Sequence, residues 1–273
     1  MSLRQLLDEI DLLAGVPVTV RAHDERVEQE LRVARRIQRA LVGLTEMGLD
    51  GWNLASEYEP ARVIGGDFFD AFPILDSGRS RRLGLVIADV SGKGISAALL
   101  MAFVRPVIRA AIDRTGDPAE ALERTNRILV GERRTGLFVT VLCGVLDLGT
   151  GELILGNAGH ELPILVPADG SAPRAVGESG PLVGAFGRLD LRPATVALAP
   201  GDRLLLYTDG VTDAADAAGQ RFGEERLLAL LAGAPASGAE GLTESIVDAL
   251  TSFRGAAEPA DDVALLVVER LAT

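Results

Sequence analysis

The chain is poor in the residue types that most often carry side-chain nucleophiles. Its 273 residues include one cysteine, Cys143, and two histidines, His23 and His160. One cysteine excludes an intrachain disulfide and fits a reducing compartment, so a cytoplasmic location is expected. Cys143 also lies inside a strand-like apolar run, a poor setting for a catalytic thiol. Neither histidine accompanies the G-x-S-x-G pattern typical of a serine triad.

Long apolar runs and aromatic residues are also scarce. Aromatics make up 4% of the chain, so the core must consist mainly of Leu, Val, Ile and Ala. No run of about 18 apolar residues predicts a membrane span, and no basic region followed by an apolar stretch indicates a secretion signal. The net charge of −12 argues against nucleic acid and anionic membranes as partners, because both require a basic face. Hydrophobic residues nevertheless reach 48%, enough for a large core.

Two apolar runs around a polar turn predict a β-hairpin with an acid at each end. Residues 68–75 and 83–88 are mostly apolar, and the polar stretch 76–82 has Gly78 at the hairpin midpoint. Antiparallel pairing would bring Asp67 and Asp89 to the same end of the sheet. Neighbouring carboxylates repel unless a proton or a cation lies between them, and hard divalent cations prefer oxygen ligands.

The same pattern recurs near the C-terminus. Residues 203–208 read as a strand ending at Asp209, and Asp261 precedes a strand over 263–269. An acid at the end of one strand meets an acid at the start of another when the strands run antiparallel. Four strand-end aspartates are therefore available to one metal cluster. The competing interpretation is that each serves only a turn.

Locally paired strands and paired helices indicate an α+β chain rather than alternating βαβ units. Helices over 2–14 and 25–44 predict an N-terminal helical segment, residues 1–47, ahead of one larger domain, residues 48–273. The second helix has about one apolar residue per turn, so it either packs on its own domain or serves to dimerise or transmit a signal. Pro106 is expected to kink or split a helix over 96–114.

Five motifs, in order, resemble those of a known family. They are GGDFFD (65–70), ADVSGKGISAALLMA (88–102), NAGH (157–160), YTDGVTDA (207–214) and DDVALLVV (261–268). The ordered set resembles the bacterial stage II sporulation E type protein phosphatases of the metal-dependent serine/threonine phosphatase superfamily. This resemblance implies two packed antiparallel β-sheets flanked by helical layers, with residues 48–273 as the phosphatase domain.

The resemblance also implies two divalent ions, Mn²⁺ or Mg²⁺. Asp89 would bridge them and the backbone carbonyl of Val90 would contribute, while Asp67 would complete one ion, and Asp209 and Asp261 the other. Ions about 3.5–4 Å apart lower the pKa of a shared water, so hydroxide could attack phosphorus without a side-chain nucleophile.

Further residues have open roles. Asp70 and Asp262 are expected to hold metal-bound water. His160 is a candidate proton donor to the leaving alkoxide, with a structural hydrogen-bonding role as the alternative. Arg62 is a candidate ligand of the substrate phosphate, with an exposed ion pair as the alternative. Lys93 stands where the family often has another polar residue.

The predicted function is that of a metal-dependent phosphoserine/phosphothreonine protein phosphatase. By resemblance, its substrate is a phosphorylated anti-sigma factor antagonist in a partner-switching pathway, with an upstream activator or a homodimer formed through the N-terminal helices. One alternative is a catalytically weak or inactive regulatory binding protein, against which the complete acid set argues. Another is a diguanylate cyclase, but its GGDEF signature needs a Glu where this chain has Phe68.

Overall fold

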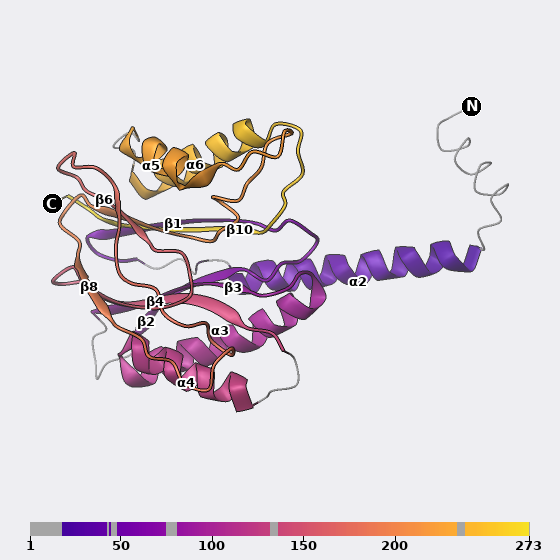
Figure 1. Ribbon diagram of the computed structural model, residues 1–273, viewed down its shortest axis with the longest axis horizontal. Helices are drawn as coiled ribbons and strands as arrows, with labels where there is room; N and C mark the ends of the chain where they lie inside the picture. Colours follow the sequence, from indigo (N-terminus) through magenta and orange to yellow (C-terminus); the bar gives the residue numbers. More distant parts are fainter. Residues whose placement is uncertain are drawn as a thin grey trace.

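Two packed β-sheets with helices on both outer faces form the four layers of this chain (Figure 1). The computed structural model describes residues 18–42, 44, 48–74, 81–131, 136–233 and 238–272. The predicted α+β class and layer order are confirmed. The helix predicted over 2–14, the proposed domain boundary at 47 and most of the polar turn at 76–82 lie outside the described residues.

The elements follow the predicted order, with small differences at their ends. The helices are α2 (Val18–Val42), α3 (Ile95–Thr115), α4 (Pro118–Gly131), α5 (Gly223–Ala232) and α6 (Gly238–Arg254). The strands are β1 (Trp52–Glu59), β2 (Phe68–Ile74), β3 (Arg82–Val90), β4 (Val139–Asp147), β5 (Glu152–Ala158), β6 (Ile164–Val166), β7 (Arg174–Ala175), β8 (Ala194–Ala197), β9 (Arg203–Tyr207) and β10 (Val263–Arg270). The sequence analysis missed β7, which is only two residues long and carries no pattern.

Every strand pair in both sheets is antiparallel. One sheet has the order β1-β10-β9-β6-β7 and the other β2-β3-β4-β5-β8. The predicted hairpin of β2 and β3 is confirmed, with Phe68 opposite Ala88. In the first sheet β1 pairs along its whole length with β10, from Trp52 opposite Arg270 to Glu59 opposite Val263. The start and the end of the domain are thereby joined.

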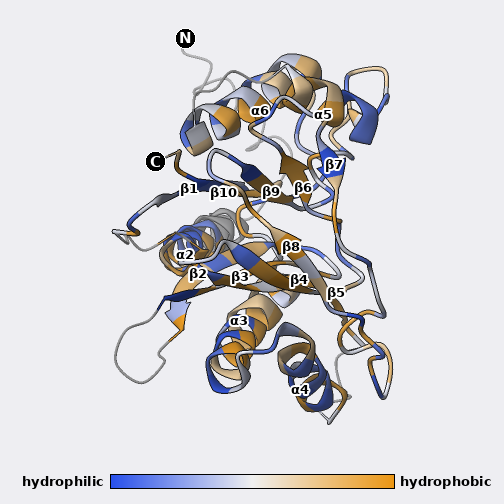
Figure 2. Cartoon of the chain, turned by 90° about the vertical axis from the view of Figure 1, so that its left-hand side faces the viewer, coloured by the Kyte–Doolittle hydropathy of each residue, from blue (hydrophilic) through white to orange (hydrophobic). Residues whose placement is uncertain are grey.

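The core has two parts because the first sheet is buried on both faces. On β9, Leu204 and Leu206 belong to the cluster between the sheets, whereas Leu205 and Tyr207 face the cluster under α5 and α6. Apolar residues accordingly line both sides of the sheets and the inner sides of the helices (Figure 2). A strand buried on both faces reads as a continuous apolar run, which is how β9 was recognised.

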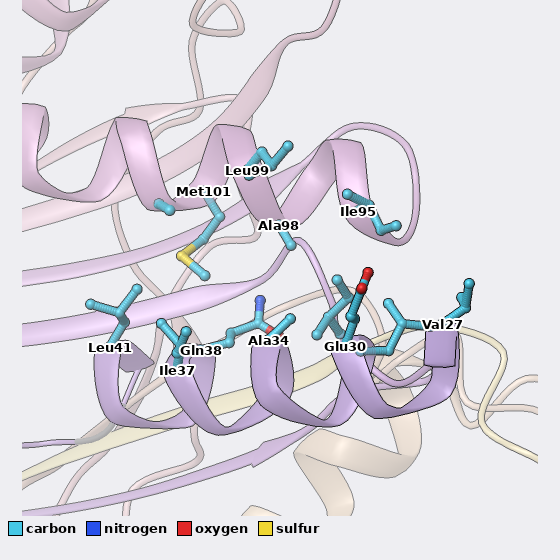
Figure 3. Close-up of a pocket in the computed structure, with 13 residues that line it drawn as sticks. Val27, Glu30, Ala34, Ile37, Gln38, Leu41, Ile95, Ala98, Leu99 and Met101 are labelled. Carbon is cyan, nitrogen blue, oxygen red and sulfur yellow. The ribbon is translucent and has the colours of Figure 1, made fainter. Parts of the chain in front are cut away.

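Helix α2 differs from its prediction at the N-terminal end. It begins at Val18 rather than residue 25, so residues 18–24, ahead of the predicted start, are already helical. Pro17 immediately precedes it, and proline is well suited to a helix start. The N-terminal part of α2 projects away from the layers (Figure 1), and its C-terminal part contacts α3 and β2. Between α2 and α3 lies an apolar groove of about 360 Å³, lined by side chains such as Ala34, Ala98 and Leu99 (Figure 3).

Helix α3 begins directly after the loop that carries Lys93. Pro106 does not split it: α3 runs unbroken from Ile95 to Thr115. By length and composition alone this helix could span a membrane, which the sequence analysis overlooked. A helix packed on a core sheet meets the same criterion, and α3 buries Met101, Val104 and Ile108 against the chain.

Candidate metal centre

The β2–β3 hairpin places Asp67 and Asp89 side by side. Asp67 directly precedes β2, and the register that pairs Phe68 with Ala88 sets Asp67 opposite Asp89. The two side chains share a hydrogen bond. Asp67 is 2% exposed; burial, together with the charges of Asp89 and Asp262, raises its pKa well above the ordinary value. The pair therefore holds a proton where two carboxylates alone would repel.

Strands β9 and β10 bring the C-terminal acids to the same place. Leu265 pairs with Tyr207, and the Thr208 N–H donates to the Ala264 carbonyl at 3.1 Å, so Asp209 and Asp261 lie at neighbouring strand ends. Burial raises the pKa of Asp209 to about 6, with further contributions from Asp89 and Asp261. Burial also raises the pKa of Asp89, and Asp261 adds to the rise. The four acids therefore act on one another electrostatically.

Asp262 holds the loop before Asp67 rather than pointing freely into the acids. Its two oxygens accept backbone N–H groups, Oδ1 from Ala61 at 2.8 Å and Oδ2 from Gly66 at 2.7 Å. A Cβ atom at Gly65 would collide with the Asp262 carboxylate, so this approach requires glycine. Asp262 thus positions the glycine pair and, through it, Asp67.

Lys93 bonds directly to one of the four acids. Its Nζ lies 2.8 Å from Oδ2 of Asp261 and 2.9 Å from the carbonyl oxygen of Ala260. The other oxygen of Asp261, Oδ1, accepts the backbone N–H of Asp262 at 3.0 Å. The hydrogen bond to Asp261 is the main reason why the pKa of Lys93 is raised. A basic group is therefore part of this acidic site.

The donor set suits hard divalent cations, although it is not arranged as a finished coordination sphere. Within the described residues, no group of three or more His, Cys, Asp or Glu side chains could hold a metal ion as placed. Lys93 and backbone amides occupy the oxygens of Asp261 and Asp262. Oδ2 of Asp67, however, is buried without a hydrogen-bond partner, and a Cβ at Gly66 would come within 2.9 Å of the Val90 carbonyl oxygen. The buried, unpartnered oxygen of Asp67 and the nearby carbonyl oxygen of Val90 fit a cation that prefers oxygen ligands.

Residues 79–271 match the family described as Stage II sporulation protein E (SpoIIE). The chain belongs to the SpoIIE family. The predicted membership of this family is therefore confirmed.

Individual relatives agree with this membership. Protein IcfG of Synechocystis is 31% identical over 229 residues, 74% of this chain and 35% of IcfG. Phosphoserine phosphatase RsbP of Bacillus subtilis is 27% identical over 247 residues, 89% of this chain and 58% of RsbP. This SpoIIE-family chain thus spans about a third to a little over half of these relatives.

Solved structures show the same fold. The SiaA-PP2C domain of Pseudomonas aeruginosa superimposes with a TM-score of 0.76 at 23% identity, over 91% of this chain and 98% of that one. The RsbU and RsbW domains of Rv1364c from Mycobacterium tuberculosis give a TM-score of 0.68 at 32% identity, over 85% of this chain and 62% of that one. The SpoIIE-family chain therefore has the PP2C fold.

Asp70 lies apart from the other acids, contrary to the role expected for it. Its carboxylate is 5% exposed and pairs with Arg105 at 3.0 Å and with Arg109 at 3.5 Å, both on α3. Burial raises its pKa, against the lowering effect of the two arginines. Asp67 and Asp70 are three positions apart, and side chains alternate between the faces of a strand, so they face opposite sides of β2. Asp70 ties the sheet to α3.

His160 is buried in a network of hydrogen bonds. Its Nδ1 lies 2.8 Å from Oγ1 of Thr140, and its backbone N–H donates to Oδ1 of Asn157 at 2.8 Å. Burial lowers its pKa to about 4, so the imidazole is neutral near pH 7. This arrangement favours the structural alternative over proton donation.

Arg62 lies at the rim of the site, where it is exposed and close enough to Lys93 to influence it. It has no hydrogen bond or ion pair within the described part of the chain, so its guanidinium is free for an anion. Its role as a phosphate ligand stays a prediction.

The sequence analysis missed three residues that contact the acid loop. Gln38 of α2 hydrogen-bonds to the backbone of Gly65. The Thr208 hydroxyl hydrogen-bonds to Asp67. The partly buried Tyr58 lies beside Asp262 and Asp67, whose charges add to the effect of burial in raising its pKa. Thr208 lies within the YTDG motif and could have been found there; nothing in the sequence around Gln38 or Tyr58 indicates such a contact.

Proposed function

We propose that this chain is a metal-dependent phosphatase that acts on phosphoserine or phosphothreonine in a protein. The observation that carries the proposal is the hydrogen-bonded pair of Asp67 and Asp89, with Asp209 and Asp261 acting on Asp89 electrostatically. So dense a group of carboxylates around the buried Asp67 costs stability unless it binds cations. Membership of the SpoIIE family supports the same reading.

Each acid has a role in this proposal. Asp67, Asp89, Asp209 and Asp261, together with the backbone carbonyl of Val90, would hold two divalent ions, Mn²⁺ or Mg²⁺. When bound, such ions supply Lewis acidity toward a phosphoryl group and lower the pKa of water.

The remaining residues orient the site and receive the substrate. Asp262 holds the loop of Ala61 and Gly66 in place, which sets the position of Asp67. Arg62 would pair with the phosphate of the substrate at the rim, since guanidinium forms paired hydrogen bonds to phosphate oxygens. Neutral His160 would hold the turn after β5 and would not act as the proton donor to the leaving alkoxide.

The substrate is proposed by analogy with named relatives. RsbP and RsbU of Bacillus subtilis are both named phosphoserine phosphatases, and a solved chain combines RsbU and RsbW domains. We infer that the substrate is an anti-sigma factor antagonist in a partner-switching pathway. An upstream activator or a second copy would act through α2, whose Val27, Val33 and Ile37 are exposed.

Hydrolysis of a chromogenic phosphate ester tests the activity. We expect turnover with Mn²⁺ or Mg²⁺ and none with EDTA. Asp89→Asn and Asp209→Asn should abolish turnover while circular dichroism shows an unchanged fold. Asp248→Asn, on the exposed side of α6, is the matched control and should keep the parental rate. Equal rates in all three variants would overturn the site assignment, and metal-independent hydrolysis would overturn the mechanism.

A further inference from the structure

Lys93 is the only lysine in the chain. The sequence has 27 basic residues counted as Lys and Arg, and the other 26 are arginines. Every other position that needs a cation therefore uses arginine. Lysine differs from arginine in being a compact point charge on a flexible stem, without the planar fork that binds carboxylates in pairs. Its single occurrence falls within the candidate metal centre.

The loop that carries Lys93 is shaped to bring it to Asp261. Gly92 and Gly94 flank it with φ angles of 95° and 74°, in the left-handed region that favours glycine. The ammonium bonds to Oδ2 of Asp261 at 2.8 Å, and Oδ1 of the same carboxylate accepts a backbone N–H. Both oxygens that a divalent ion would use already have partners, one of them a positive charge.

The ion pair between Lys93 and Asp261 is exposed to solvent rather than buried. The side chains of Lys93 and Asp261 are 45% and 44% exposed, so solvent reaches the ion pair. Exposed ion pairs of this kind contribute little to stability. Lys93 can therefore leave Asp261 at small cost when a stronger cation arrives.

We propose that Lys93 competes with a divalent ion for Asp261 and thereby weakens metal binding at that ligand. This inference rests on the proposed function, in which Asp261 is a metal ligand. A single charge and a divalent ion about 5 Å apart repel, even in high dielectric, by enough to change affinity on the order of tenfold. The flexible stem lets the ammonium swing into solvent, so the competition lowers the affinity without abolishing it.

Mn²⁺ titration of the purified full chain, by calorimetry or electron paramagnetic resonance, tests the competition. Lys93→Met keeps the length of the side chain without its charge and should lower the Kd of the weaker site about tenfold. Lys93→Arg keeps the positive charge and is the matched control; its Kd should be no lower than that of the parent, because a guanidinium pairs with a carboxylate at least as well as an ammonium does. If the parent binds Mn²⁺ and Lys93→Met binds it no more tightly, the competition is overturned while the proposed function stands. A parent chain that binds no Mn²⁺ would overturn the proposed function and the competition with it.

A second readout uses the single lysine directly. An acetylating N-hydroxysuccinimide ester has one side-chain amine to modify, and mass spectrometry of peptides separates it from the α-amino group. Mn²⁺ should speed the labelling of Lys93 in the parent, because the displaced ammonium is released from Asp261. In Asp261→Asn, labelling should be fast with and without Mn²⁺. Labelling of the parent that Mn²⁺ leaves unchanged would overturn the proposal.

Discussion

Gln38 forms hydrogen bonds to the backbone of Gly65 through both ends of its side-chain amide. Its Nε2 donates to the carbonyl oxygen of Gly65 at 2.6 Å, and its Oε1 accepts the Gly65 N–H at 3.1 Å. Gln38 is 5% exposed and belongs to α2, and Gly65 lies two residues before Asp67. The projecting helix is thus fastened to the loop that carries a proposed metal ligand, so a movement of α2 would move that loop.

Replacing Gln38 with alanine should loosen this loop. Gln38→Ala leaves a buried N–H and a buried carbonyl of Gly65 unpaired, which should cost about 1–3 kcal/mol of the free energy of unfolding. Because Asp67 is then less well placed, the Mn²⁺ concentration for half-maximal hydrolysis should rise about tenfold, as for other residues that orient metal ligands. Urea unfolding and Mn²⁺ titration of the hydrolysis rate measure the two effects.

Arg36→Ala is the control for that variant. Arg36 is exposed on the same helix, so its replacement should change the unfolding free energy by about 0.5 kcal/mol or less and leave the Mn²⁺ dependence unaltered. Equal Mn²⁺ dependence in Gln38→Ala and the parent would show that the hydrogen bonds between Gln38 and Gly65 do not position Asp67.

The sequence predicted the hairpin well because two independent signals agreed. Apolar runs marked β2 and β3, and their common midpoint at Gly78 set the register that places Asp67 opposite Asp89. The strand ends at Asp209 and Asp261 followed from the same reasoning. Contacts between elements far apart in the chain left no such mark in the sequence. Gln38, among the charged residues of α2, looks like any exposed polar residue.

Asp70 shows a different kind of error. All but one of the residues of β2 are buried, so the strand lacks the alternation of apolar and polar residues that would reveal its two faces. Asp70 was grouped with Asp67 because the two are close in sequence. Counting by twos from Asp67 would have assigned Asp70 to the opposite face, where α3 supplies its arginine partners.

Asp70→Asn should destabilise the chain without affecting metal binding. It leaves Arg105, whose side chain is 17% exposed, without its carboxylate, and breaking a buried ion pair costs about 3 kcal/mol or more. Urea unfolding measures the loss, and Mn²⁺ titration at low temperature should give the parental Kd. A weakened Kd in a folded Asp70→Asn chain would restore Asp70 to the metal centre.

His160→Gln should retain most of the hydrolytic activity. His160 is neutral near pH 7 because burial lowers its pKa to about 4, so the acidic imidazolium form that a general acid needs is scarce at that pH. Glutamine can still form a hydrogen bond with Thr140, and we expect a rate within about tenfold of the parent, short of the 10²–10⁴-fold loss typical of a general acid. The pH–rate profile between pH 6 and 8 should keep its shape. A larger loss, together with a changed profile, would assign proton transfer to His160.

Asp209 should make the metal-free chain less stable as the pH rises. Its folded-state pKa of about 6 lies above the ordinary 3.8, so the folded chain binds this proton more tightly than the unfolded chain does. The resulting stability is fully present below pH 3.8 and is lost as the pH rises through 6. In EDTA, the free energy of unfolding should therefore fall between pH 5 and pH 7.5, by about 1 kcal/mol from this partly exposed group.

Asp209→Asn removes the titrating carboxyl and should flatten that fall, and it should be more stable than the parent at pH 7.5 in EDTA. Urea unfolding at both pH values measures the free energy of unfolding. Identical pH dependence in parent and variant would show that the folded chain does not raise the pKa of Asp209.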